Sequence, residues 1–148
     1  MEEFKLYEES AERSVIGALL LDNESIYNCE FLKPGMFGFE KYKQVFSIIS
    51  KMIADNHPAD VVTVNSRLVE LEIDGLIDGL MGLVAIVQNT PSAANIARYA
   101  NIVKNKYIDR QLLHVADEIR QLVLSSALKS EEKQQQAEKL ISDIADSV

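Results

Sequence analysis

Residues 107–148 read YIDRQLLHVADEIRQLVLSSALKSEEKQQQAEKLISDIADSV, and this stretch decides the fold. It contains no proline or glycine, and apolar residues recur every three or four positions on both sides of the short segment Ser125–Ser130. That spacing is typical of amphipathic helices, and a short connection between two of them predicts an antiparallel hairpin. A lone hairpin has too little core to be stable, so we expect its remaining apolar face to pack against another surface.

The rest of the chain has the same helical spacing and almost no alternation of apolar and polar residues, so we predict an all-α fold. We expect Ser10 to cap the first helix and Thr63 the fourth, because these side chains accept hydrogen bonds from helix N-termini. A change of register near Asn105 leaves open whether one helix or two cross that point. The expected helices span about 10–21, 24–29, 40–54, 63–71, 80–88, 93–124 and 131–148.

Length and spacing together predict one domain over residues 1–148, with a compact multi-helix head at about 8–104 and the helical hairpin at about 107–148. The formal net charge is −8 and no run of basic residues occurs, which argues against a free-standing nucleic-acid-binding protein. The single cysteine, Cys29, excludes an internal disulfide and fits a cytoplasmic location. Residues 1–5 lack the layout of a signal peptide, and no apolar run approaches the roughly 18 residues that span a membrane.

A search for catalytic motifs finds neither a phosphate-binding GxxxxGK[ST] loop nor a GxGxxG, GxSxG or HExxH motif. His114, Asp117 and Glu118 have the spacing of metal ligands on one helix, but no second helix offers a matching set, so a polar helix face is the preferred interpretation. Acidic residues near the start of the first helix are expected to be exposed and to interact with the helix dipole; they are Glu8, Glu9 and Glu12. We therefore predict no catalytic, cofactor-binding or metal-binding residues.

Four stretches resemble the N-terminal domain of bacterial replicative DNA helicases of the DnaB type. SAERSVIGALLLDN at Ser10–Asn23 is similar to the family's opening motif, and ADVVTV at Ala59–Val64 to a later one. NTPSAANI at Asn89–Ile96 and YANIVK at Tyr99–Lys104 match a further motif almost letter for letter. The family pattern continues through Arg110, Leu112, Ala116, Glu118 and Ile119.

The resemblance implies a non-catalytic domain whose hairpins pair, so that six copies form a collar above the ring of motor domains. It implies that the collar receives the C-terminal domain of primase and, in some systems, a helicase loader. DNA, ATP and Mg²⁺ would be bound only by the motor domain, which we expect to follow Val148 in a longer protein.

The sequence departs from the family pattern at a few positions. Asp78 and Gly79 stand where a Gly-Gly pair is usual, Gly82 stands where an aromatic residue is common, and the predicted hairpin tip at 125–136 is of lower complexity. Two alternatives remain. A free-standing adaptor or inhibitor could mimic this domain, and the reading frame beyond Val148 would distinguish it. A small helical enzyme with a metal at His114 would be identified by metal analysis.

The apolar residues of the hairpin exceed what one seam between two helices can bury. Leu112 and Leu113 point about 100° apart on a helix, so we expect one to seal the hairpin and the other to meet a neighbouring subunit or primase. The candidate interface residues are Leu112, Leu113, Ile119, Val123, Leu140, Ile141 and Ile144.

Overall fold

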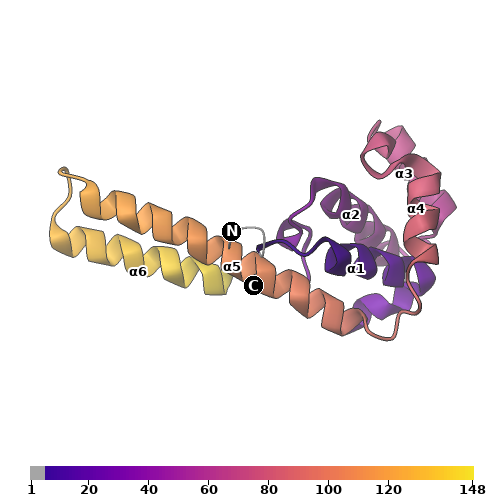
Figure 1. Cartoon of the computed structure of the whole chain (residues 1–148), viewed down its shortest axis with the longest axis horizontal. Helices are drawn as coiled ribbons and strands as arrows, with labels where there is room; N and C mark the ends of the chain where they lie inside the picture. Colours follow the sequence, from indigo (N-terminus) through magenta and orange to yellow (C-terminus); the bar gives the residue numbers. More distant parts are fainter. Residues whose placement is uncertain (1–5) are drawn as a thin grey trace.

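The computed structural model describes residues 6–148, and within this range it contains helices and loops but no strand. A compact head of short helices stands at one end, and a long helical hairpin extends from it (Figure 1). The predicted all-α fold, a multi-helix head followed by a C-terminal antiparallel hairpin, is confirmed. Residues 1–5, which we expect not to be a signal peptide, lie outside the described residues. No helix in 6–148 is both long and apolar enough to cross a membrane.

Six α-helices and three short 3-10 helices follow one another in the described residues. The α-helices are α1 (Glu9–Leu21), α2 (Glu40–Ala54), α3 (Val61–Glu70), α4 (Gly79–Gln88), α5 (Ile96–Leu124) and α6 (Ser130–Asp146). The 3-10 helices are η2 (Asn23–Asn28), η3 (Pro34–Met36) and η4 (Asp74–Ile77).

Helix α1 forms the centre of the head, because it packs against α2, α4 and α5. Its apolar residues repeat every three or four positions, and Val15, Ile16 and Leu19 are fully buried. Gly17 allows α1 to approach the end of α4, since a Cβ atom at this position would overlap the side chain of Thr90. Side chains from the surrounding helices complete the core, among them Phe46, Ile49, Leu68, Leu83 and Ile96.

Two helix starts differ from the prediction. Helix α1 begins at Glu9, and Ser10 lies inside it, where its hydroxyl donates to Glu8 Oε1 at 2.9 Å. Helix α3 begins at Val61 because Asp60 caps it: Asp60 Oδ1 accepts from Thr63 N at 2.8 Å, and Thr63 Oγ1 accepts from Asp60 N at 2.9 Å. The hydrogen bonds that the Asp60 carboxylate accepts from Thr63, above all the one from the backbone N–H, lower the pKa of Asp60 because they favour its ionised form.

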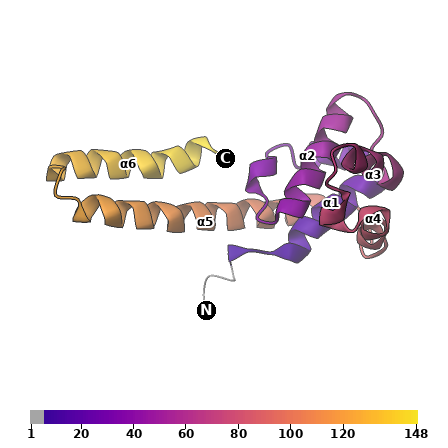
Figure 2. The ribbon, with the colours of Figure 1, turned by 90° about the horizontal axis from the view of Figure 1, so that it is seen from above.

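Helix α5 is a single unbroken helix of 29 residues, so no second helix begins near Asn105. Its first part is buried in the head through Ile96, Ala100 and Val103. Its second part leaves the head and pairs with α6, as Figure 2 shows from above. The head and the hairpin therefore share one helix, about 43 Å long.

Candidate protein-interaction surface

Hydrogen bonds fasten α6 to the rest of the molecule at both ends. Near the tip of the hairpin, Lys133 Nζ donates to the carbonyl oxygen of Val123 in the last turn of α5 at 2.8 Å. At the base, Tyr107 Oη donates to Ser147 Oγ at 3.2 Å, and Lys33 Nζ of the head donates to the carbonyl oxygen of Ser147 at 3.3 Å. These contacts hold the two helices antiparallel and set their register.

The seam between α5 and α6 is shallow. Val115 is the only buried residue in the hairpin part of α5, and no residue of α6 is buried. Leu122, Leu140 and Ile144 are only partly buried. A two-helix layer cannot exclude water from both of its sides, so the apolar residues beside the seam stay accessible.

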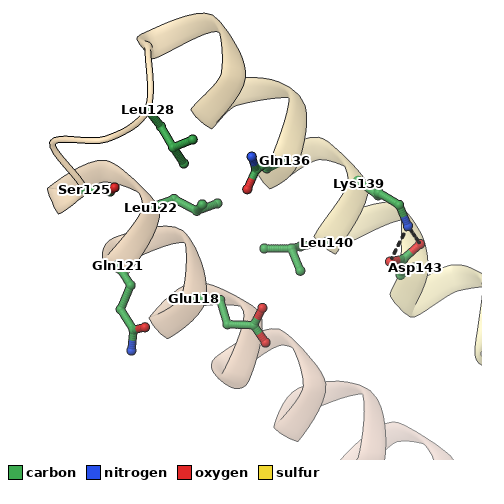
Figure 3. A pocket seen from close by; sticks show the side chains of 9 residues that line it. All are labelled: Glu118, Gln121, Leu122, Ser125, Leu128, Gln136, Lys139, Leu140 and Asp143. Carbon is green, nitrogen blue, oxygen red and sulfur yellow. Dashed lines mark hydrogen bonds and ion pairs between the residues drawn. The ribbon is translucent and has the colours of Figure 1, made fainter.

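One flank of the hairpin is polar. A groove of about 450 Å³ runs along it, with Leu122, Leu128 and Leu140 pointing between the helices (Figure 3). Polar side chains surround these leucines, and Lys139 Nζ lies 3.1 Å from Asp143 Oδ2. The polar residues lining this groove are Glu118, Gln121, Ser125, Gln136, Lys139 and Asp143.

The opposite flank, which we call the apolar flank, has a different composition. A second groove there is lined by the apolar side chains of Ile119, Leu122, Val123 and Ala137 and, near the hairpin tip, by Ser130, Lys133 and Gln134. At 100° per residue, Leu112 of α5 and Ile141 of α6 fall on this same side of the seam. Leu112, Val123 and Ile141 are 48%, 59% and 52% exposed. A strip of large apolar side chains is therefore accessible on this flank, which is the usual character of a protein-interaction surface.

The structure separates the predicted interface residues into groups. Leu112, Val123 and Ile141 are exposed on the apolar flank, and Ile119 lies partly buried in its groove. Leu140 lines the polar flank instead, and Ile144 is partly buried. Their role in an interface stays a prediction.

The expectation that Leu112 or Leu113 seals the hairpin is wrong. Val115 does so, because it points towards α6 and is 7% exposed. Leu112 lies about 60° from the direction of Val115 and Leu113 about 160°, so Leu113 is on the outer side of α5. Helix geometry sets the angles between these residues about the axis of α5, but only the packing shows which direction faces α6.

Sequence reasoning missed a cluster that joins the base of the hairpin to the head. Arg110 of α5 donates through Nη1 to the carbonyl oxygen of Leu6 at 2.7 Å and through Nη2 to that of Met36 at 2.9 Å. Its guanidinium carbon lies 4.8 Å from the centre of the Tyr7 ring, a cation–π arrangement. We call Arg110 and its neighbour Glu12 the hairpin anchor.

Glu12 is buried, contrary to the prediction that it is exposed. It is 1% exposed and accepts hydrogen bonds from Gly38 N at 2.9 Å and Phe39 N at 3.1 Å. The signal was present in the spacing, because Glu12 precedes the buried Val15 and Ile16 by three and four residues. Burial raises the pKa of the Glu12 carboxyl, although its two backbone donors and the charge of Arg110 act in the opposite direction.

This pKa makes the contribution of Glu12 to stability dependent on pH. A carboxyl whose pKa is higher in the folded than in the unfolded chain stabilises at low pH, and the contribution is lost as pH rises through the folded-state pKa. We expect the native chain to exceed the Glu12→Gln variant in free energy of unfolding by an amount that is largest at about pH 4 and shrinks as the pH rises from there towards neutral. Urea unfolding of both chains across this range measures the difference, and a difference that grows with pH would contradict the expectation.

His114 lies on the exposed surface of α5 beside Glu118, with 2.6 Å between Nε2 and Oε1. Among residues 6–148, no group of three or more His, Cys, Asp or Glu side chains is placed to hold a metal ion. His114 and Glu118 therefore form a pair of neighbouring side chains, four residues apart, on one face of α5.

Comparison with known proteins places these features in a family. The family model described as the DnaB-like helicase N terminal domain matches residues 5–105. The replicative DNA helicase DnaC of Bacillus subtilis is 31% identical over 136 residues, which cover 91% of this chain and 30% of that protein. The replicative DNA helicase DnaB of a Nostoc species is 33% identical over 110 residues, covering 74% of this chain and 12% of that protein. The chain thus spans less than a third of the length of these relatives.

Solved structures agree with this assignment. The N-terminal domain of DnaB helicase from Mycobacterium tuberculosis superposes with a TM-score of 0.85 and 30% identity, over 93% of this chain and 97% of that one. A DnaB-like replicative helicase studied with its interactions with primase has the same fold over 93% of this chain and 31% of that one, with a TM-score of 0.76 and 20% identity. The resemblance seen in the sequence is confirmed, and the chain belongs to the DnaB-like helicase N-terminal domain family.

Proposed function

We propose that this chain is the non-catalytic assembly and protein-interaction domain of a replicative DNA helicase in the cytoplasm. In this role its hairpin pairs subunits, six copies form a collar, and the collar binds the C-terminal domain of primase or a helicase loader. Contacts with DNA, and binding of ATP and Mg²⁺, belong to a motor domain elsewhere in the protein. The relation to replicative helicases and the structural likeness to a helicase studied with primase support this proposal.

The observation that carries the proposal is the uncovered apolar flank of the hairpin. Leu112, Val123 and Ile141 are each about half exposed, and no element of the described chain packs over them. The same flank on a second copy offers an identical apolar strip, so a two-fold axis would bury both at once. The polar flank, with its Lys139–Asp143 ion pair, would then remain in water.

Two adjacent leucines provide a matched test of the pairing. Leu112 and Leu113 are 48% and 45% exposed, but only Leu112 lies on the apolar flank. We expect Leu112→Asp to raise the dissociation constant for self-association at least about tenfold, because a charge would be buried between subunits. Leu113→Asp should leave it unchanged. Sedimentation equilibrium over a range of concentrations measures both.

Circular dichroism melts of the two variants serve as the folding control, since either aspartate can remain in water in the single chain. Equal weakening by both substitutions would contradict pairing through the apolar flank. A native chain that stays monomeric at the highest attainable concentration would contradict it as well.

A further inference from the structure

A pocket on the head belongs to neither flank of the hairpin. It has a volume of about 370 Å³ and lies between η2, the segment 29–34 and α2, and we call it the η2–α2 pocket. Its buried lining residues are all apolar, since Cys29, Leu32 and Phe46 are 1%, 6% and 2% exposed. Small molecules usually bind in pockets of about 300–1,000 Å³ that are mostly apolar inside.

The spacing of residues on α2 explains one wall of the pocket. Ser50 and Ile53 follow Phe46 by four and seven positions, so the three residues lie on the same face of the helix. Ile26 of η2 lines the pocket as well, and both isoleucines pack against the core of the head. The pocket is therefore formed by segments that the core holds in place.

The interior of the pocket and its mouth differ in polarity. Glu30, Lys33 and Asn56 line the pocket and are exposed, so they lie at the mouth, where the two charges are opposite in sign. Among residues 6–148, the one buried side-chain oxygen or nitrogen without a hydrogen-bond partner is Asn65 Oδ1, which does not line this pocket. The interior thus has no buried side-chain group that a ligand must satisfy, and a charge placed there would lose its hydration.

The polar mouth favours a ligand that enters the pocket whole. A docked helix needs a line of exposed apolar side chains that recur every three or four positions. Among the exposed residues of this pocket, Tyr27 is the one large apolar side chain, and it is 65% exposed. The apolar surface therefore lies within the pocket and does not continue around it.

We propose that the η2–α2 pocket binds a small uncharged aromatic molecule. A cavity of about 150 Å³ is enough to hold benzene, so a pocket of about 370 Å³ has room for two fused rings. Phe46 inside the pocket and Tyr27 at its mouth would contact these rings, and contacts between aromatic rings gain more than their buried area alone. The proposal is independent of pairing through the hairpin, because the pocket shares no residue with the apolar flank.

The pocket also lies beside the attachment of the hairpin. Lys33, which lines it, donates through Nζ to the carbonyl oxygen of Ser147 at 3.3 Å, where the end of α6 meets the head (Figure 2). A bound molecule would therefore contact both α2 and the segment that fastens α6. Since it binds the folded chain, it should also raise the melting temperature.

Indole and indole-3-carboxylate are matched probes, because they differ only by one carboxylate group. In ¹H–¹⁵N NMR spectra of the native chain, indole should shift the amide signals of residues 26–34 and 46–56, with a dissociation constant of about 1 mM. Indole-3-carboxylate should bind at least about tenfold more weakly, since its charge would have to leave water. Equal affinity for the two probes, shifts centred on the hairpin, or no shift at about ten times that indole concentration would each overturn the proposal.

Two serines of α2 provide a matched pair of variants. Ser50 lines the pocket, whereas Ser47 is exposed and lines a different groove. The chain has no tryptophan, so Ser50→Trp would place an indole ring covalently in the pocket. We expect Ser50→Trp to weaken indole binding at least about tenfold and to emit at shorter wavelength than Ser47→Trp, because its ring would be removed from water. Ser47→Trp should bind indole as the native chain does.

Unchanged indole binding by Ser50→Trp, or equal weakening by both tryptophan variants, would contradict a site in this pocket. If Ser50→Trp instead alters self-association in sedimentation equilibrium, a side chain of a second copy occupies the pocket and the proposal is wrong. Leu112→Asp should leave indole binding intact, which separates the pocket from the apolar flank. Circular dichroism melts check that the variants are folded, and the NMR titration of the native chain decides the question without them.

Discussion

Replacing Glu12 by alanine is expected to lower the free energy of unfolding by about 3–5 kcal/mol. The side chain is 1% exposed, and its two carboxylate oxygens accept hydrogen bonds from Gly38 N and Phe39 N. Alanine would leave two buried backbone donors without partners and would remove the charge that faces Arg110. It would also open a cavity beneath the turn that precedes α2.

Glu9 provides the matched control, three residues earlier in the same helix. It accepts a hydrogen bond from Tyr42 Oη at 3.1 Å and lies 3.4 Å from Lys41 Nζ, but its side chain is 44% exposed. Water can replace these partners, so we expect Glu9→Ala to cost at most about 1 kcal/mol. Urea unfolding at neutral pH measures both variants, and similar losses would show that the burial of Glu12 does not matter.

Gly82→Ala is expected to lower the free energy of unfolding by about 3 kcal/mol. Alanine usually stabilises a helix relative to glycine, by about 0.5–1 kcal/mol. Here the added Cβ atom would overlap the backbone carbonyl of Ile77, which cannot move without shifting η4 against α4.

Gly75→Ala is the control for this substitution, because nothing lies within 4 Å of a Cβ atom at that position. It belongs to η4, next to the same corner, and should change stability by less than about 0.5 kcal/mol. Thermal unfolding followed by circular dichroism at about 222 nm, where α-helices give a strong negative band, compares the two variants. A Gly82→Ala chain as stable as the native one would mean that the corner between η4 and α4 adjusts freely.

Helical periodicity predicted the elements well where one face of a helix is buried. Helix α2 was predicted at 40–54 and begins and ends at those residues, since Phe46 and Ile49 mark a clear apolar face. Helix starts were less predictable, because several neighbouring polar residues compete for the capping position. Asp60 rather than Thr63 caps α3, although both take part in the reciprocal hydrogen bonds.

The candidate site was predictable only in part. The sequence indicated that the hairpin carries more apolar residues than its seam can bury, and it named Leu112, Val123 and Ile141. The sequence could not show which flank these residues occupy. The rotation of α5 about its axis relative to α6 depends on contacts at both ends of the hairpin. In the sequence, Arg110 stands out only as part of a family motif, because its contacts with Leu6 and Met36 join segments more than 70 residues apart.

The position of Arg110 on α5 has a mechanical consequence. Fourteen residues of the helix precede it and fourteen follow it, so the anchor holds a rigid rod at its midpoint. A rod pivoted at its centre has two equal arms of about 21 Å. The arm before Arg110 is buried in the head through Ile96, Ala100 and Val103, so a tilt imposed on the hairpin tip is resisted by the anchor and by the core of the head together. Arg110→Ala would remove the anchor at the midpoint and leave the hairpin arm held to the head mainly by the buried first half of α5.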